Sequence, residues 1–207
     1  GINPSKDYIP VSPAAHYTMG GVKTDIQART SVKGLYAIGE AACSGLHGAN
    51  RLASNSILEC VVMAYELVNF LKTIDTNETN ENDEKINATI KEYDREITDE
   101  HFDCESAIDD LKEIMWKYVG IVRNEEGLNK ADKELSELLH NFKYTTKCPD
   151  LMNYTVRNLS TVASLIIYMA QARKESRGAH FRDDYPLTEP VGVSNCIDIN
   201  TLRKAAL

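Results

Sequence analysis

The sequence predicts an α+β fold, in which short strands and one long helix come first and a bundle of amphipathic helices follows. Up to residue 71, short apolar runs bounded by glycine precede a single long apolar segment, and from residue 86 onwards apolar residues recur every three or four positions. Residues 72–85 between these parts are almost wholly polar, which is typical of a linker. We therefore divide the chain into a first domain (1–71), a linker (72–85), a helical bundle (86–174) and a charged, irregular tail (175–207).

The composition excludes several classes of function. The chain has 207 residues, a formal net charge of −8 and a pI near 5.2, so it lacks the concentrated basic surface that nucleic acid or an anionic membrane requires. No apolar run reaches the roughly 20 residues that cross a bilayer, and the first residues do not have the pattern of a signal peptide. The five cysteines are scattered without metal-ligand spacing. We expect a cytoplasmic protein with no metal site and with reduced thiols.

The first domain is expected to contain short strands and a buried helix. Gly20 and Gly21 suit a tight turn between two strands, HYTM and VKTD. The apolar run Leu35–Ile38, bounded by glycines, predicts a buried strand. The segment from residue 57 to 71 is apolar on nearly every side, which predicts a buried helix with Ser54 or Asn55 as its cap.

The second half of the chain is expected to be helical. Four sets of apolar residues with helical spacing mark amphipathic helices around residues 86–97, 107–119, 128–142 and 151–169. Pro149 and Asp150 mark the start of the last of these. Such stripes can be buried only against one another or against another domain, so we predict a small antiparallel bundle. The tail shows no periodic pattern, and we expect one helical turn at residues 201–207.

Three motifs carry a resemblance to a known family. GLYAIGE followed by GLHGANRLASNSILE, within residues 34–59, resembles the flavin-binding segment of the L-aspartate oxidases. These enzymes belong to the superfamily of the succinate dehydrogenase and fumarate reductase flavoproteins. PAAHYTMGG at residues 13–21 and RKESRGAHFRDDYP at residues 173–186 resemble the same family in the same order. The resemblance implies the carboxy-terminal piece of an FAD-binding domain followed by a helical domain.

The resemblance implies FAD as the cofactor and assigns four residues to it. Glu40 would accept hydrogen bonds from the ribityl chain, although from its position alone it could equally be a solvated acid at a strand end. Asn50, Ser56 and Ile57 would lie at the flavin, because the amino end of the long helix presents unpaired N–H groups and a positive dipole end. In the family this helix end points at the pyrimidine edge of the isoalloxazine ring.

Arg51 is the candidate that would bind a substrate carboxylate. A guanidinium pairs bidentately with a carboxylate, and an arginine that leads into a buried helix requires an anion. The alternative is a structural ion pair with an Asp or Glu. A histidine in a turn is commonly just a hydrogen-bonding residue, but the resemblance assigns His16 and His47 to the same dicarboxylate substrate. The charged residues of 173–186 are interpreted as ion pairs that tie the helical part to the first domain.

The implied function is FAD-dependent oxidation of L-aspartate to iminoaspartate in NAD biosynthesis, with dioxygen or fumarate as the acceptor. The chain contains no GxGxxG turn and no candidate for the family's proton-transfer arginine, so we expect the carboxy-terminal part of a longer enzyme that by itself binds FAD weakly or not at all. Expected partners are the amino-terminal part of the same chain and the next enzyme of quinolinate synthesis. Two alternatives stay open, namely a succinate dehydrogenase or fumarate reductase flavoprotein and a helical interaction module without activity.

Overall fold

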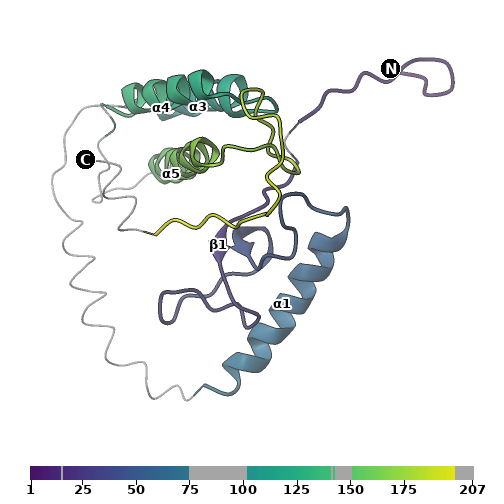
Figure 1. Cartoon of the computed structure of the whole chain (residues 1–207), viewed down its shortest axis with the longest axis vertical. Coiled ribbons are helices and arrows are strands. Elements are labelled where there is room, and N and C mark those ends of the chain that lie inside the picture. The colour runs from purple at the N-terminus through teal and green to yellow at the C-terminus, as the bar shows by residue number, and fades with distance from the viewer. Residues whose placement is uncertain (15, 75–101, 141, 143–150, 199–207) are drawn as a thin grey trace.

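The α+β class predicted from the sequence is confirmed by the structure, a computed structural model that describes residues 1–198 except 15, 75–101, 141 and 143–150. In chain order the elements are β1 (Val22–Lys23), the 3-10 turn η1 (Gly39–Ala41), β2 (Ala42–Cys43), α1 (Asn55–Leu71), α3 (Cys104–Val119), α4 (Glu125–Leu138) and α5 (Leu151–Ala172). Figure 1 shows α3, α4 and α5 together on one side of the short strands and α1 by itself on the other. None of the helices among these described residues is long and apolar enough to span a bilayer.

The hydrophobic core lies between α3, α4 and α5, as the helical spacing of their apolar residues predicted. Each of the three helices packs against the other two, and the buried side chains come from all of them: Leu111, Ile114, Val119, Leu128, Ala131, Leu135, Ala163, Ile167 and Ala170. A helix whose apolar stripe is about 100° wide can hide it only against similar stripes. The helical bundle is thus confirmed for these three helices.

Two of the bundle helices begin at side chains that accept a hydrogen bond from the first turn. The Asp103 carboxylate accepts from the N–H of Ser106 at 3.0 Å at the start of α3. The Asn124 side-chain oxygen accepts from the N–H of Gly127 at 2.8 Å at the start of α4. Each cap satisfies an N–H group that has no partner inside the helix, which explains why both helices start where they do.

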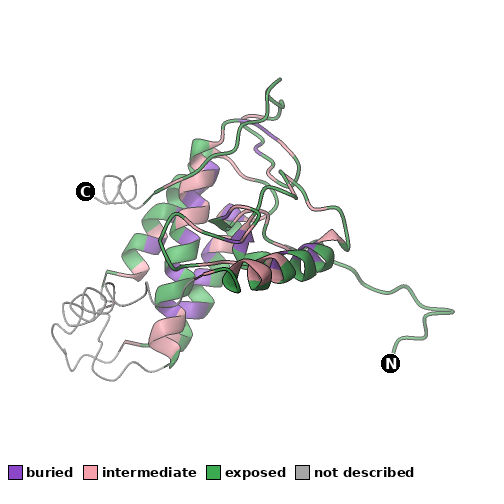
Figure 2. Ribbon diagram, turned by 90° about the horizontal axis from the view of Figure 1, so that it is seen from below, coloured by how far each residue is buried: buried purple, intermediate pink, exposed green. Residues whose placement is uncertain are grey.

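The prediction that the helix after residue 55 is buried is wrong. In α1 only Ser56, Glu59 and Met63 are buried, and Figure 2 draws the other residues of the helix in the colours of exposed and intermediate residues. Among the named elements it packs against η1, and loop residues such as Ser44 and His47 contact its buried side. The remaining large apolar side chains are exposed: Ile57, Leu58, Val61, Val62, Tyr65, Val68 and Leu71. The apolar composition therefore predicted the helix, but not how many of its faces are covered in this chain.

Ser54, one of the two predicted cap residues, is the N-cap of α1, but it does not cap the helix with its side chain. Ser54 is the residue that precedes the helix, but its backbone lies in the left-handed region with φ of 72° and its side chain makes no capping hydrogen bond. Its carbonyl accepts from the N–H of Ile57 at 3.2 Å. The first turn is consequently tightened by a backbone bond rather than closed by a side chain.

The predicted hairpin between HYTM and VKTD is wrong. Instead, β1 pairs with β2 in parallel, with Val22 opposite Ala42. Gly20 and Gly21 have φ of 125° and 124°. A Cβ atom at Gly21 would overlap the carbonyl of Ala41, so this glycine permits two backbones to approach closely and does not form a hairpin turn.

The predicted buried strand at Leu35–Ile38 is wrong as well. The structure has only an isolated antiparallel bridge between Arg29 and Tyr36, and Leu35 and Ile38 are 51% and 39% exposed. A four-residue apolar run acquires strand geometry only where another strand pairs with it along its length. Among the described residues it makes one bridge, and Glu40 lies in η1.

The charged tail is irregular over its described residues, as predicted, and it is held by specific hydrogen bonds. It pairs with the segment between α3 and α4, where the N–H of Arg123 donates to Phe181 at 3.2 Å and the N–H of Asp183 donates to Arg123 at 2.9 Å. It also reaches the first part of the chain through Ala179, whose N–H donates to the Ala49 carbonyl at 2.9 Å. Figure 1 shows the tail passing from the bundle to the strands.

Several sequence predictions fall outside the described residues. They concern the helix around residues 86–97, nearly all of the linker, the start signal at Pro149 and Asp150, and the turn at residues 201–207.

Candidate functional site

The candidate site is built on the loop between β2 and α1, which carries several of the predicted residues. Two tight turns shape this loop, with the N–H of Gly48 donating to Gly45 at 3.3 Å and the N–H of Asn50 donating to His47 at 3.1 Å. Gly45 and Gly48 have φ of 90° and 53°. Both values are ones that glycine adopts at no steric cost. The loop thereby turns His47 back toward the beginning of α1.

Glu59 gathers two side chains of this loop on the buried face of α1. One carboxylate oxygen accepts from the hydroxyl of Ser44 in a short hydrogen bond, and the other lies 2.8 Å from Nε2 of His47. The side chains of His47 and Glu59 are 10% and 4% exposed. A carboxylate at such a depth is stable only when its oxygens are hydrogen-bonded. Both oxygens of Glu59 have a partner here.

Arg51 lies between an aromatic ring and the first turn of α1. Its guanidinium carbon is 4.5 Å from the centre of the Tyr17 ring, and Nη1 donates to the Ser56 hydroxyl at 2.9 Å. The same tyrosine ring meets His47 edge-on, with the ring centres 5.4 Å apart. The five side chains Glu59, His47, Tyr17, Arg51 and Ser56 consequently form one chain of contacts that starts and ends on α1.

The charges around Tyr17 affect its ionisation. Partial burial and then the carboxylates of Glu59 and Glu40 raise the pKa of Tyr17, while the positive charge of Arg51 acts in the opposite direction. The phenol therefore stays protonated at neutral pH. Arg51 itself is half-buried, and among the described residues no Asp or Glu lies within ion-pair distance of it.

The other predicted residues occupy different positions around this loop. Glu40 is exposed and accepts from the N–H of Thr18 at 2.9 Å. His16 and Asn50 are exposed, and Ser56 is buried. Ile57 is exposed, and its N–H donates to the carbonyl of Ser54. The structure thus brings His47, Arg51 and Ser56 together, and leaves Asn50 and His16 at the surface beside them.

The charged tail packs directly against the loop between β2 and α1. Gly178 has φ of 59°, and a Cβ atom there would overlap the carbonyl oxygen of Ala49. The neighbouring Ala179 N–H donates to that same carbonyl. The tail therefore contacts the loop directly at Ala49, two positions before Arg51. The glycine of the SRG sequence fits this contact because any other residue would place a Cβ atom against the Ala49 carbonyl.

Sequence reasoning missed Tyr17, Ser44 and Glu59 as members of this cluster. Glu59 had one signal, because it is an acid in a segment that is otherwise apolar, and a buried acid requires partners. Tyr17 lies next to His16 in the HYT motif, but nothing in its spacing predicts a contact with Arg51. Such contacts depend on how the loop folds back.

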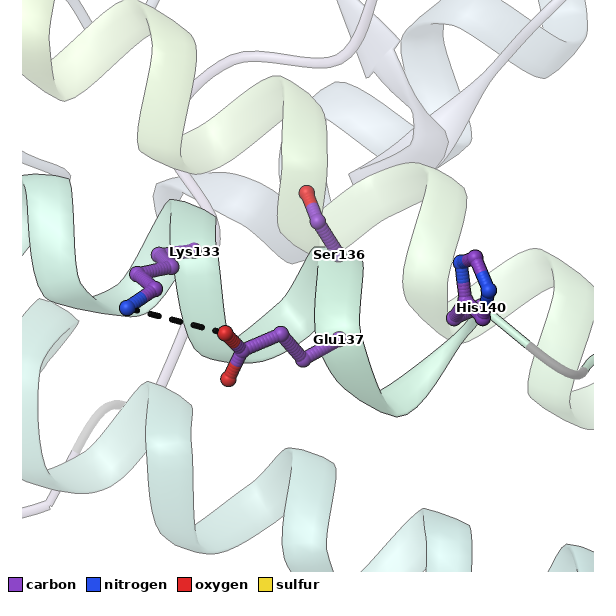
Figure 3. Close-up of a pocket in the computed structure, with 4 residues that line it drawn as sticks. All are labelled: Lys133, Ser136, Glu137 and His140. Carbon is purple, nitrogen blue, oxygen red and sulfur yellow. Dashed lines mark ion pairs between the residues drawn. The ribbon is translucent and has the colours of Figure 1, made fainter.

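A surface pocket elsewhere in the molecule has no comparable chemistry. It has a volume of about 390 Å³ and is lined by Lys133, Ser136, Glu137 and His140 on and just after α4. Figure 3 shows Lys133 and Glu137 pointing toward one another; their charged atoms are 3.6 Å apart and both side chains are largely exposed. An exposed pair one helical turn apart is an ordinary surface ion pair.

Comparisons with known proteins show which families the chain is similar to. Residues 1–57 match the FAD binding domain model, and residues 108–191 match the model of the fumarate reductase flavoprotein carboxy-terminal domain. The L-aspartate oxidase of Pyrococcus horikoshii is 41% identical over 90% of this chain, and L-aspartate oxidase 1 of Ralstonia nicotianae is 43% identical over 92% of it. Two segments of the chain thus match flavoprotein models, and about 90% of its length is similar to L-aspartate oxidases.

Two solved structures are similar to this chain in fold. The FrdA chain of E. coli quinol fumarate reductase has 33% identity and a TM-score of 0.71 over 92% of this chain. The Sdh1 complex of Mycobacterium smegmatis in its apo form has 27% identity and a TM-score of 0.72 over 91% of it. The match covers 35% and 34% of those chains. Likewise, the chain spans about a third of the length of the curated L-aspartate oxidases that it matches.

Proposed function

We propose that the protein takes part in the FAD-dependent oxidation of L-aspartate to iminoaspartate, with Arg51 binding a substrate carboxylate. The observation that carries this proposal is the state of Arg51. It is half-buried beside the amino end of α1, one of its nitrogens is held by Ser56, and no carboxylate among the described residues neutralises it. A partly buried guanidinium with unused donors is suited to bidentate pairing with a carboxylate.

His16 and His47 are assigned to the same substrate site. His16 precedes Tyr17, whose ring lies against both Arg51 and His47, so the two histidines belong to the same region of the surface. His16 is exposed, which allows contact with a ligand. Nε2 of His47 is hydrogen-bonded to Glu59, which leaves Nδ1 as the ring nitrogen that can contact a ligand. A substrate with two carboxylates requires several such donors, and groups outside the 207 residues are expected to supply the rest.

The residues around the loop fit one edge of FAD. Glu40 presents an exposed carboxylate that can accept hydrogen bonds from sugar hydroxyls in addition to the one from Thr18. The first turn of α1 contains no acidic residue, so its positive dipole end is not neutralised where Asn50, Ser56 and Ile57 lie. No GxGxxG turn for the pyrophosphate occurs in the 207 residues. We therefore expect these residues alone to bind FAD weakly or not at all.

When bound, FAD would supply the redox chemistry by accepting a hydride from the substrate α-carbon. The residues of this chain would hold the substrate carboxylates and fix the orientation of the α-carbon, which lowers the entropic part of the barrier. Dioxygen or fumarate would be the final acceptor. Iminoaspartate is an unstable imine, and we propose that it is passed to the next enzyme of quinolinate synthesis.

The experiment is turnover by the complete natural protein in air. With L-aspartate we expect hydrogen peroxide and, after hydrolysis of the imine, ammonia, whereas succinate should cause little flavin reduction. A second candidate is a succinate dehydrogenase or fumarate reductase activity, which the similarity to the E. coli fumarate reductase structure favours. Rapid flavin reduction by succinate and none by L-aspartate would replace the first proposal with the second.

A helical interaction module without activity is the remaining alternative. It predicts that the complete protein shows no flavin absorbance after purification and acquires none when FAD is added. Stoichiometric flavin absorbance that survives gel filtration would exclude it.

A further inference from the structure

We propose that Glu59 is a positioning residue for the substrate site, and that it sets the orientation of the Arg51 guanidinium through His47 and Tyr17. This proposal rests on the proposed function of Arg51. The contacts that carry it connect the Glu59 carboxylate on α1 to His47, His47 to Tyr17, and Tyr17 to the half-buried Arg51. None of these contacts is between neighbours in the sequence.

The first step is the attachment of the chain of contacts to α1. Glu59 is only 5% exposed and lies one helical turn after Ser56, so the two residues share a face of the helix. Glu59 holds His47, and Ser56 holds Arg51. Because an α-helix is stiff, the distance between these two attachment points does not vary.

The second step is the proton on His47. An ionised carboxylate has no proton to donate, so the 2.8 Å contact with Glu59 requires that Nε2 of His47 carries the hydrogen. The hydroxyl of Ser44 occupies the other oxygen of Glu59. With both oxygens used, the carboxylate cannot rotate to another partner, and the plane of the His47 ring is held with it.

The third step is the transfer of this orientation to Arg51. The His47 and Tyr17 rings are inclined at 84° with their centres 5.4 Å apart, a T-shaped arrangement that aromatic pairs favour. The face of Tyr17 then lies 4.5 Å from the Arg51 guanidinium carbon. A guanidinium stacked on a ring and bonded by one nitrogen keeps its plane fixed, which is what bidentate binding of a carboxylate requires.

The experiment measures the dissociation constant of succinate for the complete protein loaded with FAD, from the change in flavin absorbance. Four variants are compared with the parent protein: Glu59→Gln, His47→Gln, the double variant and Arg51→Lys. We expect Glu59→Gln to weaken succinate binding about ten- to a hundredfold, because a supporting hydrogen bond to a ligand residue commonly has an effect of this size. Flavin stoichiometry should be unchanged.

The double variant tests whether Glu59 acts through His47. If it does, the double variant should bind succinate as weakly as the weaker single variant and no more weakly, because one path has been interrupted twice. Multiplied effects would show two independent roles and would overturn the proposal. Binding by Glu59→Gln within about twofold of the parent would overturn it too, since about twofold is within the additivity error of such comparisons.

A second readout does not depend on turnover. The ¹⁵N chemical shifts of the His47 ring should show hydrogen on Nε2 in the parent protein, and Glu59→Gln should change this distribution, because an amide can also donate. An unchanged ring in Glu59→Gln would contradict the proposal. If Glu59→Gln does not fold, Ser44→Ala decides the matter, since it leaves the carboxylate in place but frees one of its oxygens; succinate binding equal to that of the parent would then overturn the proposal.

The matched control is Glu134→Gln in the bundle, where the Glu134 carboxylate accepts from the Tyr118 hydroxyl at 2.9 Å. It replaces a hydrogen-bonded carboxylate away from the site by an amide, the same change as in Glu59→Gln, and should leave succinate binding unchanged. Arg51→Lys separates the two proposals. If Arg51→Lys loses affinity and Glu59→Gln does not, the positioning role is wrong and the substrate site stands; if neither loses affinity, both are wrong.

Discussion

Asp184 binds the buried guanidinium of Arg182 with both carboxylate oxygens, at 2.8 Å from Nε and 2.6 Å from Nη2. One of these oxygens also accepts from the N–H of Glu125 at the start of α4, at 2.8 Å. The third guanidinium nitrogen donates to the carbonyl of Ala170 in the last turn of α5, at 2.9 Å. The carboxylate thus lies at a positive helix end and the guanidinium at a negative one, which is the favourable arrangement for both. This pair joins two bundle helices through the tail.

Replacing Asp184 should destabilise the bundle. Asp184→Ala leaves the fully buried Arg182 without its carboxylate and removes a partner from the first turn of α4. We expect a loss of about 3 kcal/mol in the free energy of unfolding, because Arg182 becomes a buried charge without a carboxylate partner. Urea denaturation of the complete protein is the measurement.

The control for Asp184 is Asp109→Asn, which breaks an exposed ion pair with Lys112 on the surface of α3. It should change the free energy of unfolding by less than about 1 kcal/mol. Equal effects of the two substitutions would contradict the importance of the Arg182–Asp184 pair.

The stability should fall as the pH is lowered below the usual pKa of histidine, because of His180. Burial, and then the positive charges of Arg123, Arg173 and Arg182, lower the pKa of His180. Arg123 can only donate, so Nδ1 of His180 accepts from it at 2.9 Å and Nε2 donates to the Arg173 carbonyl at 3.2 Å. The folded protein therefore keeps this ring neutral.

The sign of the effect follows from proton uptake. Below a pH of about 6.5 the unfolded chain protonates its histidine while the folded protein does not, so the free energy of unfolding decreases with falling pH until the lowered pKa of the folded state is reached. Thermal melts between about pH 8 and pH 5 measure this. His180→Gln can form both hydrogen bonds without titrating, and its melts should lose this part of the pH dependence; an unchanged slope would contradict the role of His180.

The contact between Gly178 and Ala49 should be needed for both stability and substrate binding. Gly178→Ala places a Cβ atom against the Ala49 carbonyl in addition to forcing a side chain into the left-handed region. We expect a loss of about 2 to 3 kcal/mol in the free energy of unfolding and weaker succinate binding, because the loop with Arg51 is displaced.

Gly34→Ala is the matched control for Gly178. Gly34 has φ of 82°, but nothing lies within 4 Å of the position of its Cβ atom. It should therefore show only the conformational cost of about 1 kcal/mol and normal succinate binding. If both variants behave alike, the steric contact with Ala49 has no separate effect.

Arg51→Lys should impair catalysis while FAD remains bound. Lysine keeps the charge but cannot stack on Tyr17 and bind a carboxylate with two parallel donors, so we expect a loss of about 2 to 4 kcal/mol in transition-state stabilisation, measured as kcat/KM with L-aspartate. Arg157→Lys on the exposed side of α5 is the control and should have no effect. Unchanged kcat/KM with retained flavin would exclude Arg51 from the substrate site.

The sequence determined the helices of the bundle. The apolar stripes of α3, α4 and α5 repeat every three or four residues, and Asp103 and Asn124 stand before the first two as capping residues. The stripes depend on residues within one or two turns of each other, so periodicity is sufficient to predict them, whereas the two caps were identified in the structure. The motifs around His16, Glu40 and Arg51 likewise indicated the family, because each is a contiguous run of residues that can be recognised without knowing what it contacts.

Tertiary structure alone decided which surfaces are covered and which side chains meet. The apolar composition of α1 predicted burial on all sides, yet only one of its faces is covered, because burial depends on neighbours that the helix does not itself encode. The parallel pairing of β1 with β2, in place of a hairpin, joins residues 20 positions apart. The contacts of Glu59 with His47 and of Tyr17 with Arg51 likewise join residues that no local pattern relates, and they exist because the loop turns back onto the first turns of α1.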